Sequence, residues 1–229
     1  MPDRPTISSW SDWEARFAAF LREQAEVDAA HDRAHIERVV ANARRLIRDT
    51  DAAPEVVVPA AWLHDCVVVP KDHPRRSEAS VLAAEAAVDF LSDADYPAPW
   101  HADIKHAIAA HSYSGTVAPD TLEAKIVQDA DRLDALGAVG IARCFMVGGS
   151  LNHALYDPDD PFCADRAPDD DTYAVDHFFA KLLRLPDTMQ TEAGREEAER
   201  RAAVMRNYLD QLGIEIGEPP APERFAPYT

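Results

Sequence analysis

The chain has 229 residues, 47% hydrophobic and 28% charged, which is the balance of an ordinary folded protein. Its 23 Lys and Arg against 41 Asp and Glu give a formal net charge of −18, which excludes long nucleic acid and anionic membranes as favoured partners. No run of residues approaches the roughly 18 apolar residues of a membrane span, and three cysteines without C-x-x-C spacing favour neither disulfides nor a thiolate zinc site. We expect a cytoplasmic protein. The net charge does not exclude a small anion as ligand, because a local cluster of basic side chains can outweigh distant charges that salt screens.

Apolar spacing predicts helices along nearly the whole chain, so the expected fold class is all-α. A nearly all-apolar helix is expected to run through AAWLHDCVVV and to stop at Pro70. Gly137 and Gly140 leave open whether residues 121–147 form one helix or two. The other predicted helices span residues 10–27, 31–48, 77–91, 100–111, 174–184 and 192–212.

The order of these elements predicts four parts. Residues 1–27 form an N-terminal helix that packs on the core, and residues 28–147 carry the candidate site. Residues 148–215 form a C-terminal helical extension, in which the Pro- and Asp-rich stretch 157–171 is an acidic loop without a helix. Residues 216–229 form an extended tail.

Two ionisable residues, His64 and Asp65, interrupt the most apolar stretch of the chain. A buried carboxylate needs a cation, a hydrogen-bond network or water, because an unpartnered buried charge is costly. His35 shares a helix face with Val39 and Ala43 and is expected to point inward. Taken singly, each of these features is also typical of satisfied polar groups in a core.

Three aspartates, Asp129, Asp131 and Asp134, fall within six residues of an otherwise apolar helix. They cannot all avoid the core side. Asp131 shares a face with Val127 and Asp129 shares one with Ile126, so the periodicity does not select between them. Two histidines, Asp65 and one of these aspartates would supply a mixed nitrogen and oxygen set suited to a divalent transition metal.

The chain resembles the HD-domain metal-dependent phosphohydrolases, which are named for a metal-binding His-Asp pair. The ordered pattern H, HD, D is met by His35, His64-Asp65 and Asp131, the last in an ADRL context. The resemblance to small stand-alone bacterial members covers residues 28–212, through the segments AHDRAHIERV, WLHDCVVVPKDHPRRSEAS, HAIAAHSYS, IVQDADRLDALGAVGIAR and DHFFAKLLRLPDTMQTEAGR.

This resemblance implies a helical HD-domain fold with the metal site inside the helix bundle. It implies His35, His64, Asp65 and Asp131 as ligands of a divalent ion (Mn, Co, Ni, Fe, Zn or Mg), and it favours Asp131 over Asp129. The activity it implies is hydrolysis of a phosphate ester or anhydride, commonly in a nucleotide, of nucleotidase or nucleoside triphosphate pyrophosphohydrolase type. The base and sugar of the substrate stay open.

Basic residues follow the His-Asp pair directly. We assign Lys71, Arg75 and Arg76 to substrate phosphates, since Arg binds phosphate bidentately and Lys neutralises it, although solvated surface charge is the alternative for each.

Histidines outside the motif are further candidates. His111 follows Ile108 by three residues and should face the core, where it binds a substrate oxygen, donates a proton or makes a structural hydrogen bond. His106 falls on another face, and the resemblance makes both histidines candidates for a second metal ion. His177 and Lys181 lie one helical turn apart and are weaker candidates for reaching the pocket.

The mechanism that we expect is attack of metal-bound hydroxide on phosphorus. Asp65, or Asp129, would orient or deprotonate the water, and His111 would act with Asp65 as the second catalytic residue. Two alternatives are a di-iron oxygenase on the same scaffold, with extra histidines completing a second metal site, and a non-catalytic nucleotide sensor.

Overall fold

The computed structural model describes residues 5–25, 33–67, 69, 75–112 and 115–218. These residues form α-helices and short 3-10 helices, labelled η, and contain no β-strand, which confirms the all-α prediction. In chain order the helices are α1 (Trp10–Ala25), α2 (Arg33–Leu46), α3 (Pro54–Leu63), η1 (Arg76–Glu78), α4 (Ala79–Asp93), η2 (Ala98–Trp100), α5 (His101–Ala109), α6 (Leu122–Asp134), α7 (Gly137–Ser150), α8 (Asp176–Ala180), η3 (Leu182–Thr188) and α9 (Glu192–Ile216).

The chain forms two compact units, Met1–Asp131 and Arg132–Thr229. The division falls inside the last turn of α6. The predicted four-part organisation, with boundaries after residues 27, 147 and 215, stays a prediction.

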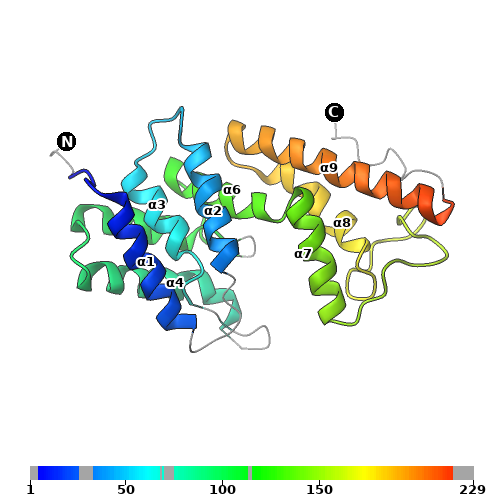
Figure 1. Cartoon of the computed structure of the whole chain (residues 1–229), viewed down its shortest axis with the longest axis horizontal. Helices are drawn as coiled ribbons and strands as arrows, with labels where there is room; N and C mark the ends of the chain where they lie inside the picture. The colour runs from blue at the N-terminus through cyan, green and yellow to red at the C-terminus, as the bar shows by residue number, and fades with distance from the viewer. Residues whose placement is uncertain (1–4, 26–32, 68, 70–74, 113–114, 219–229) are drawn as a thin grey trace. The chain divides into compact units, whose positions relative to one another are not determined.

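Helix α3 is the centre of the first unit, and α1, α2, α4 and α5 all contact it (Figure 1). It is apolar all round, and every residue from Glu55 to Leu63 is buried, as expected of a helix enclosed by others. Pro54 occupies its first turn, where the missing N–H costs nothing. The buried Tyr96 hydroxyl donates to the Glu55 carbonyl at 2.6 Å and so fixes this end of α3.

Helix α3 ends at Leu63, seven residues before the predicted stop at Pro70. The prediction of a helix through AAWLHDCVVV was therefore wrong. The Cys66 N–H donates to the Leu63 carbonyl at 3.1 Å, so a tight turn replaces the next helical hydrogen bond. The valines beyond it are β-branched residues of modest helix propensity. As a result His64 and Asp65 lie on a turn just past the helix, where neighbouring side chains can point in different directions.

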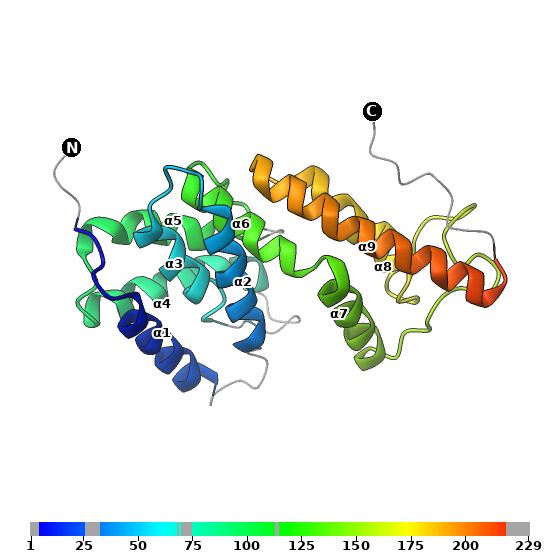
Figure 2. The same cartoon turned by 45° about the horizontal axis from the view of Figure 1, so that its top comes forward.

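The second unit is built on α9, which contacts both α7 and η3 (Figure 2). Thr191 caps α9 by accepting from the Gly194 N–H at 3.0 Å, and Gly217 ends it in the left-handed conformation. The stretch 121–147 forms two helices, α6 and α7, with Gly137 at a φ of 71° where α7 begins.

The acidic stretch between α7 and α8 contains turns and no helix in its described residues. Arg166 holds this stretch together through two ion pairs. Its guanidinium pairs with the fully buried Asp176, and its Nε lies 3.3 Å from Asp157 Oδ2.

In the part of the chain that the structure describes, no single helix is both long and apolar enough to cross a bilayer; α6 and α7 meet that test only when counted together across the break between them.

Candidate metal centre

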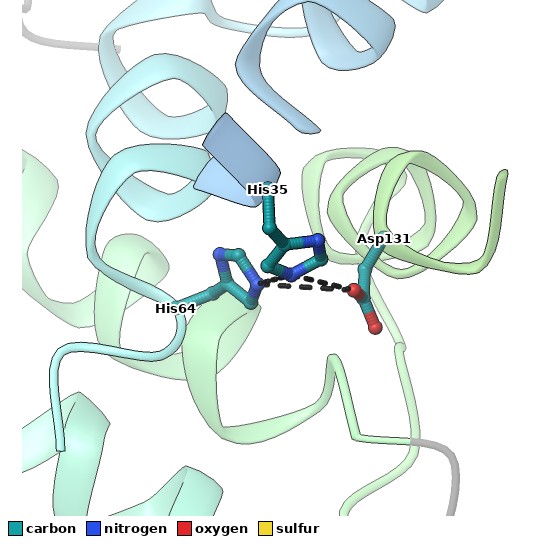
Figure 3. A group of neighbouring side chains, drawn as sticks. All are labelled: His35, His64 and Asp131. Atoms are coloured by element: carbon teal, nitrogen blue, oxygen red, sulfur yellow. Dashed lines mark hydrogen bonds and ion pairs between the residues drawn. The ribbon is translucent and has the colours of Figure 1, made fainter. Parts of the chain in front are cut away.

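Three side chains from three elements meet inside the first unit (Figure 3). His35 comes from the first turn of α2, His64 from the turn after α3, and Asp131 from the end of α6. The two Nε2 atoms lie 3.3 Å apart, and Asp131 Oδ1 lies 3.4 Å from His35 Nε2 and 3.8 Å from His64 Nε2. Nitrogen and oxygen atoms from distant parts of the sequence therefore converge on one point.

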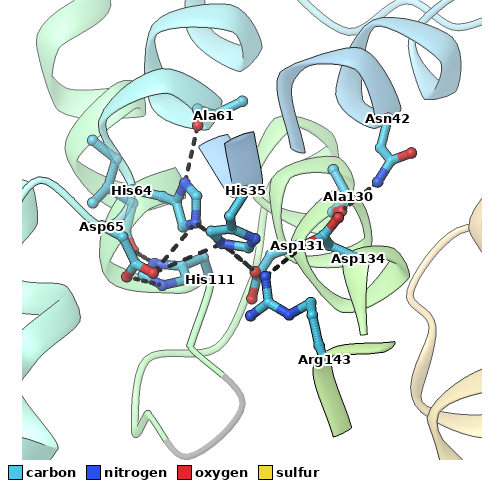
Figure 4. Close-up of polar contacts among 11 residues, drawn as sticks. His35, Asn42, Ala61, His64, Asp65, His111, Ala130, Asp131, Asp134 and Arg143 are labelled. Atoms are coloured by element: carbon cyan, nitrogen blue, oxygen red, sulfur yellow. Dashed lines mark hydrogen bonds and ion pairs between the residues drawn. The ribbon is translucent and has the colours of Figure 1, made fainter. Parts of the chain in front are cut away.

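Asp65 and His111 extend this cluster (Figure 4). Asp65 Oδ2 lies 3.6 Å from His64 Nε2 and 3.9 Å from His35 Nε2, while its Oδ1 lies 3.4 Å from His111 Nε2. The His64 side chain is 0% exposed and the Asp65 side chain is 52% exposed. The carboxylate thus touches the buried histidines on one side and opens to solvent on the other.

Backbone carbonyls behind the cluster orient two of the imidazoles. His64 Nδ1 lies 2.9 Å from the Ala61 carbonyl oxygen, and His111 Nδ1 lies 2.6 Å from that of Ile108. A carbonyl only accepts hydrogen bonds, so Nδ1 carries the proton in both rings. Nε2 of His64 is then left with its lone pair directed at the cluster, the form in which histidine binds metals.

The charge states favoured by this geometry differ along the cluster. Burial lowers the pKa of His64, with the Asp65 carboxylate opposing it, so this ring is held neutral. Burial works to raise the pKa of Asp65, but the neighbouring imidazoles of His64 and His111 and a hydrogen bond from His111 lower it overall. Burial works to lower the pKa of His111, yet the same hydrogen bond and the Asp65 charge raise it overall.

The donor set fits a divalent metal ion. Ligand atoms about 2.0 to 2.2 Å from a first-row ion lie about 3 to 3.5 Å from one another at tetrahedral or octahedral angles. The separations of His35 Nε2 from His64 Nε2 and from Asp131 Oδ1, 3.3 and 3.4 Å, lie in this range. The His64–Asp131 distance of 3.8 Å and the Asp65 distances of 3.6 and 3.9 Å exceed it by a few tenths of an ångström. Two imidazoles and two carboxylates suit Mn, Fe, Co, Ni or Zn.

The other aspartates of α6 lie elsewhere. Asp129 is 0% exposed and Asp134 is 2% exposed, and Asp134 Oδ2 accepts a hydrogen bond from Arg143 Nη1 at 2.8 Å. Of the three aspartates of α6, Asp131 is the one that faces His35 and His64 (Figure 4). Neither buried neighbour belongs to the groups of possible metal ligands among the described residues.

The predicted phosphate-binding residues are only partly visible. Lys71 and the side chain of Arg76 lie outside the described residues. Arg75 is exposed and pairs with Glu78, with 2.8 Å between Arg75 Nη2 and Glu78 Oε2.

The remaining predicted residues do not belong to the groups of possible metal ligands among the described residues. His106 Nε2 accepts from the Asp120 N–H at 3.1 Å. His177 lies in the second unit and pairs with Asp170 at 2.7 Å, and Lys181 follows α8 there.

Two buried amides near the cluster were not anticipated from the sequence. Asn42 Nδ2 donates to the Ala130 carbonyl at 3.1 Å, and Gln128 Nε2 donates to the Ala110 carbonyl at 2.7 Å. Each bonded carbonyl belongs to the residue directly before a cluster residue, Asp131 or His111. The available signal was an amide among the apolar residues of the buried face of its helix.

The residues of the cluster lie within the part of the chain that matches a known family. Residues 33–136 match the HD domain family. The chain is 36% identical over 193 residues to YpgQ of Bacillus subtilis, across 82% of this chain and 85% of YpgQ.

Solved structures of related proteins resemble this chain over most of its length. An HD-superfamily hydrolase from Bacillus thuringiensis is similar with a TM-score of 0.71 and 32% identity, covering 90% of this chain and 97% of that one. The crystal structure of YpgQ in complex with ADP is similar with a TM-score of 0.65 and 34% identity, covering 88% and 95%. The chain therefore belongs to the HD-domain family.

Proposed function

We propose that this protein is a metal-dependent phosphohydrolase that cleaves a phosphate ester or anhydride of a nucleotide. The observation that carries the proposal is the convergence of His35 Nε2, His64 Nε2 and Asp131 Oδ1 within 3.8 Å of one another. Support for hydrolysis comes from the likeness to an HD-superfamily hydrolase, and support for a nucleotide comes from the relative whose structure contains ADP.

In this proposal His35, His64, Asp65 and Asp131 hold the ion. A divalent ion held by these residues would supply Lewis-acid activation of a water molecule and of a phosphoryl oxygen. The neutral His64 ring presents its Nε2 lone pair, because its Nδ1 proton is donated to the Ala61 carbonyl. The carboxylates bring negative charge that offsets the charge of the ion.

Asp65 also orients the attacking water and accepts its proton, because its carboxylate is at once adjacent to the histidines and half open to solvent. His111 donates to Asp65 Oδ1 over 3.4 Å and so fixes the direction of that carboxylate. In the reaction His111 stabilises or protonates the leaving oxygen. The nucleophile is water, so the chain itself forms no covalent bond to phosphorus.

Lys71, Arg75 and Arg76 bind the substrate phosphates. Arg75 and η1 follow the His-Asp turn in the chain, and the formal net charge of −18 makes a local basic group necessary for an anionic substrate. The Glu78 carboxylate, 2.8 Å from Arg75 Nη2, is displaced when a phosphate binds.

The test is release of phosphate and of pyrophosphate from a panel of ribo- and deoxyribonucleotides with Mn²⁺, Co²⁺, Ni²⁺ or Mg²⁺, with Asp65→Ala as the control. Release that disappears in Asp65→Ala is the expected result, and it names the substrate and the bond. Nucleotide binding without release under every metal would overturn hydrolysis and indicate a sensor. No binding and no release in metal-loaded protein would overturn the nucleotide as substrate.

A further inference from the structure

A buried amide joins the two helices that carry His35 and Asp131. Asn42 is 3% exposed, and its Nδ2 donates to the Ala130 carbonyl of α6 at 3.1 Å (Figure 4). Ala130 directly precedes Asp131. On α2, Asn42 follows His35 by seven residues, which is two helical turns, so both side chains lie on the same face.

This bridge matters because α2 packs mainly on α3. Close backbone packing between α2 and α6 is sparse among the described residues. Close backbone packing between these two helices therefore contributes little to the separation of His35 and Asp131. Helices α2 and α6 are joined by the His35–Asp131 pair at 3.4 Å and by the Asn42–Ala130 hydrogen bond.

The two contacts are separated by about 10 Å along α2, at 1.5 Å per residue. Two points of attachment that far apart restrict the angle between the helices as well as their spacing. Ala130 is rigidly joined to Asp131 within α6. Fixing the carbonyl of Ala130 therefore fixes the origin of the Asp131 side chain relative to α2.

Burial of the Asn42 amide costs free energy unless hydrogen bonds compensate for the lost water. The rest of the buried face of α2 is apolar, with Ile36, Val39, Val40, Ala43 and Leu46. A buried polar group without a hydrogen bond costs more than an apolar one of the same shape. Asn42 Oδ1 is within 3.4 Å of Arg45 Nη2 as well, so the amide is oriented with its N–H group towards α6.

We propose that Asn42 is a positioning residue of the metal centre: it holds α2 against α6 so that His35 and Asp131 stay at ligand spacing. The inference rests on the proposed metal-dependent function. Hydrogen-bonding groups behind metal ligands commonly contribute about 10- to 100-fold in metal affinity. Asn42 differs from such groups in acting through the helix backbone.

The experiment is titration of Mn²⁺ into metal-free protein by isothermal titration calorimetry. The variants are Asn42→Ala and Asn42→Leu, the second of which fills the space without the donor. Tyr96→Phe is the matched control, because it also removes one buried side-chain bond to a backbone carbonyl in the first unit, at the end of α3 remote from His64. Thermal unfolding of each metal-free protein measures the purely structural effect.

Both Asn42 variants are expected to bind Mn²⁺ about 10- to 100-fold more weakly than wild type, while Tyr96→Phe binds with wild-type affinity at a similar loss of thermal stability. Affinity within twofold of wild type in a folded Asn42 variant would overturn the inference and leave the proposed function standing. An equal loss in Tyr96→Phe would overturn it as well, by showing general loosening. Absence of Mn²⁺ binding in wild type would remove the proposed metal centre and this inference with it.

Discussion

His64 and Asp65 are adjacent in the chain, yet the side chain of one is fully buried and that of the other is half exposed. This difference follows from their place on a turn beyond α3, because consecutive residues there are not forced onto adjacent positions of a helix. The buried ring supplies a neutral nitrogen. The exposed carboxylate supplies an oxygen that a substrate and water can reach.

A variant of His111 tests whether this residue acts in catalysis without being needed to bind the metal. His111 contacts Asp65, and His64 lies against its ring edge with 4.9 Å between ring centroids. We predict that His111→Gln lowers kcat about 100- to 10,000-fold, the usual contribution of a positioned acid or base, while metal stays bound. His106→Gln, on α5 five residues before His111 and outside the cluster, serves as the control. Unchanged kcat in His111→Gln would make His111 a structural histidine.

Arg75 tests the assignment of the basic residues. We predict that Arg75→Ala raises KM for a phosphorylated substrate about tenfold, since one charged hydrogen bond contributes about 1.5 kcal/mol or more, with kcat less affected. Glu78→Gln removes the competing ion pair and is expected to leave KM unchanged or lower. Steady-state kinetics measures KM for both variants. A wild-type KM in Arg75→Ala would show that Arg75 does not bind the substrate phosphate.

Among the elements, the helices of the core were predictable because their apolar residues recur at helical spacing over long stretches. The end of α3 was not, because AAWLHDCVVV is apolar throughout and carries no glycine or proline before Pro70 to mark the turn at His64. Periodicity also left Asp129, Asp131 and Asp134 unresolved, since all three end up largely or fully shielded and only the three-dimensional arrangement distinguishes them. The family resemblance had favoured Asp131, which is the aspartate that faces His35 and His64.

The start and end of α7 provide a prediction about helix stability. Gly137 has a φ of 71°, and a Cβ built there would lie 3.3 Å from the Cβ of Arg201. We predict that Gly137→Ala lowers the free energy of unfolding by about 1 to 2 kcal/mol, the cost of the left-handed conformation for an L-residue. Gly149 is helical with nothing within 4 Å of an added Cβ, so Gly149→Ala should raise it by about 0.5 to 1 kcal/mol. Urea denaturation measures the free energy of unfolding of both variants. Equal changes in the two would contradict the assignment of a left-handed conformation to Gly137 as the cause.

For the whole molecule, the net charge limits the kind of partner, and the fold determines where the candidate metal site lies. The formal net charge of −18 disfavours long polyanions, while the helical first unit encloses a small group of histidines and carboxylates drawn from α2, the turn after α3, and α6. All of the proposed ligands lie within that unit. The metal centre that we propose is thus complete in one compact part of the chain.

The most direct measurement is the metal content of purified wild type and Asp131→Ala by elemental mass spectrometry, with circular dichroism to report the helices and Asp89→Ala, an exposed acidic residue of α4, as the control. We predict that wild type and Asp89→Ala retain a divalent metal and that Asp131→Ala loses it while keeping its helical spectrum. Retention of stoichiometric metal in Asp131→Ala would contradict the account, because it would show that Asp131 is not a required ligand.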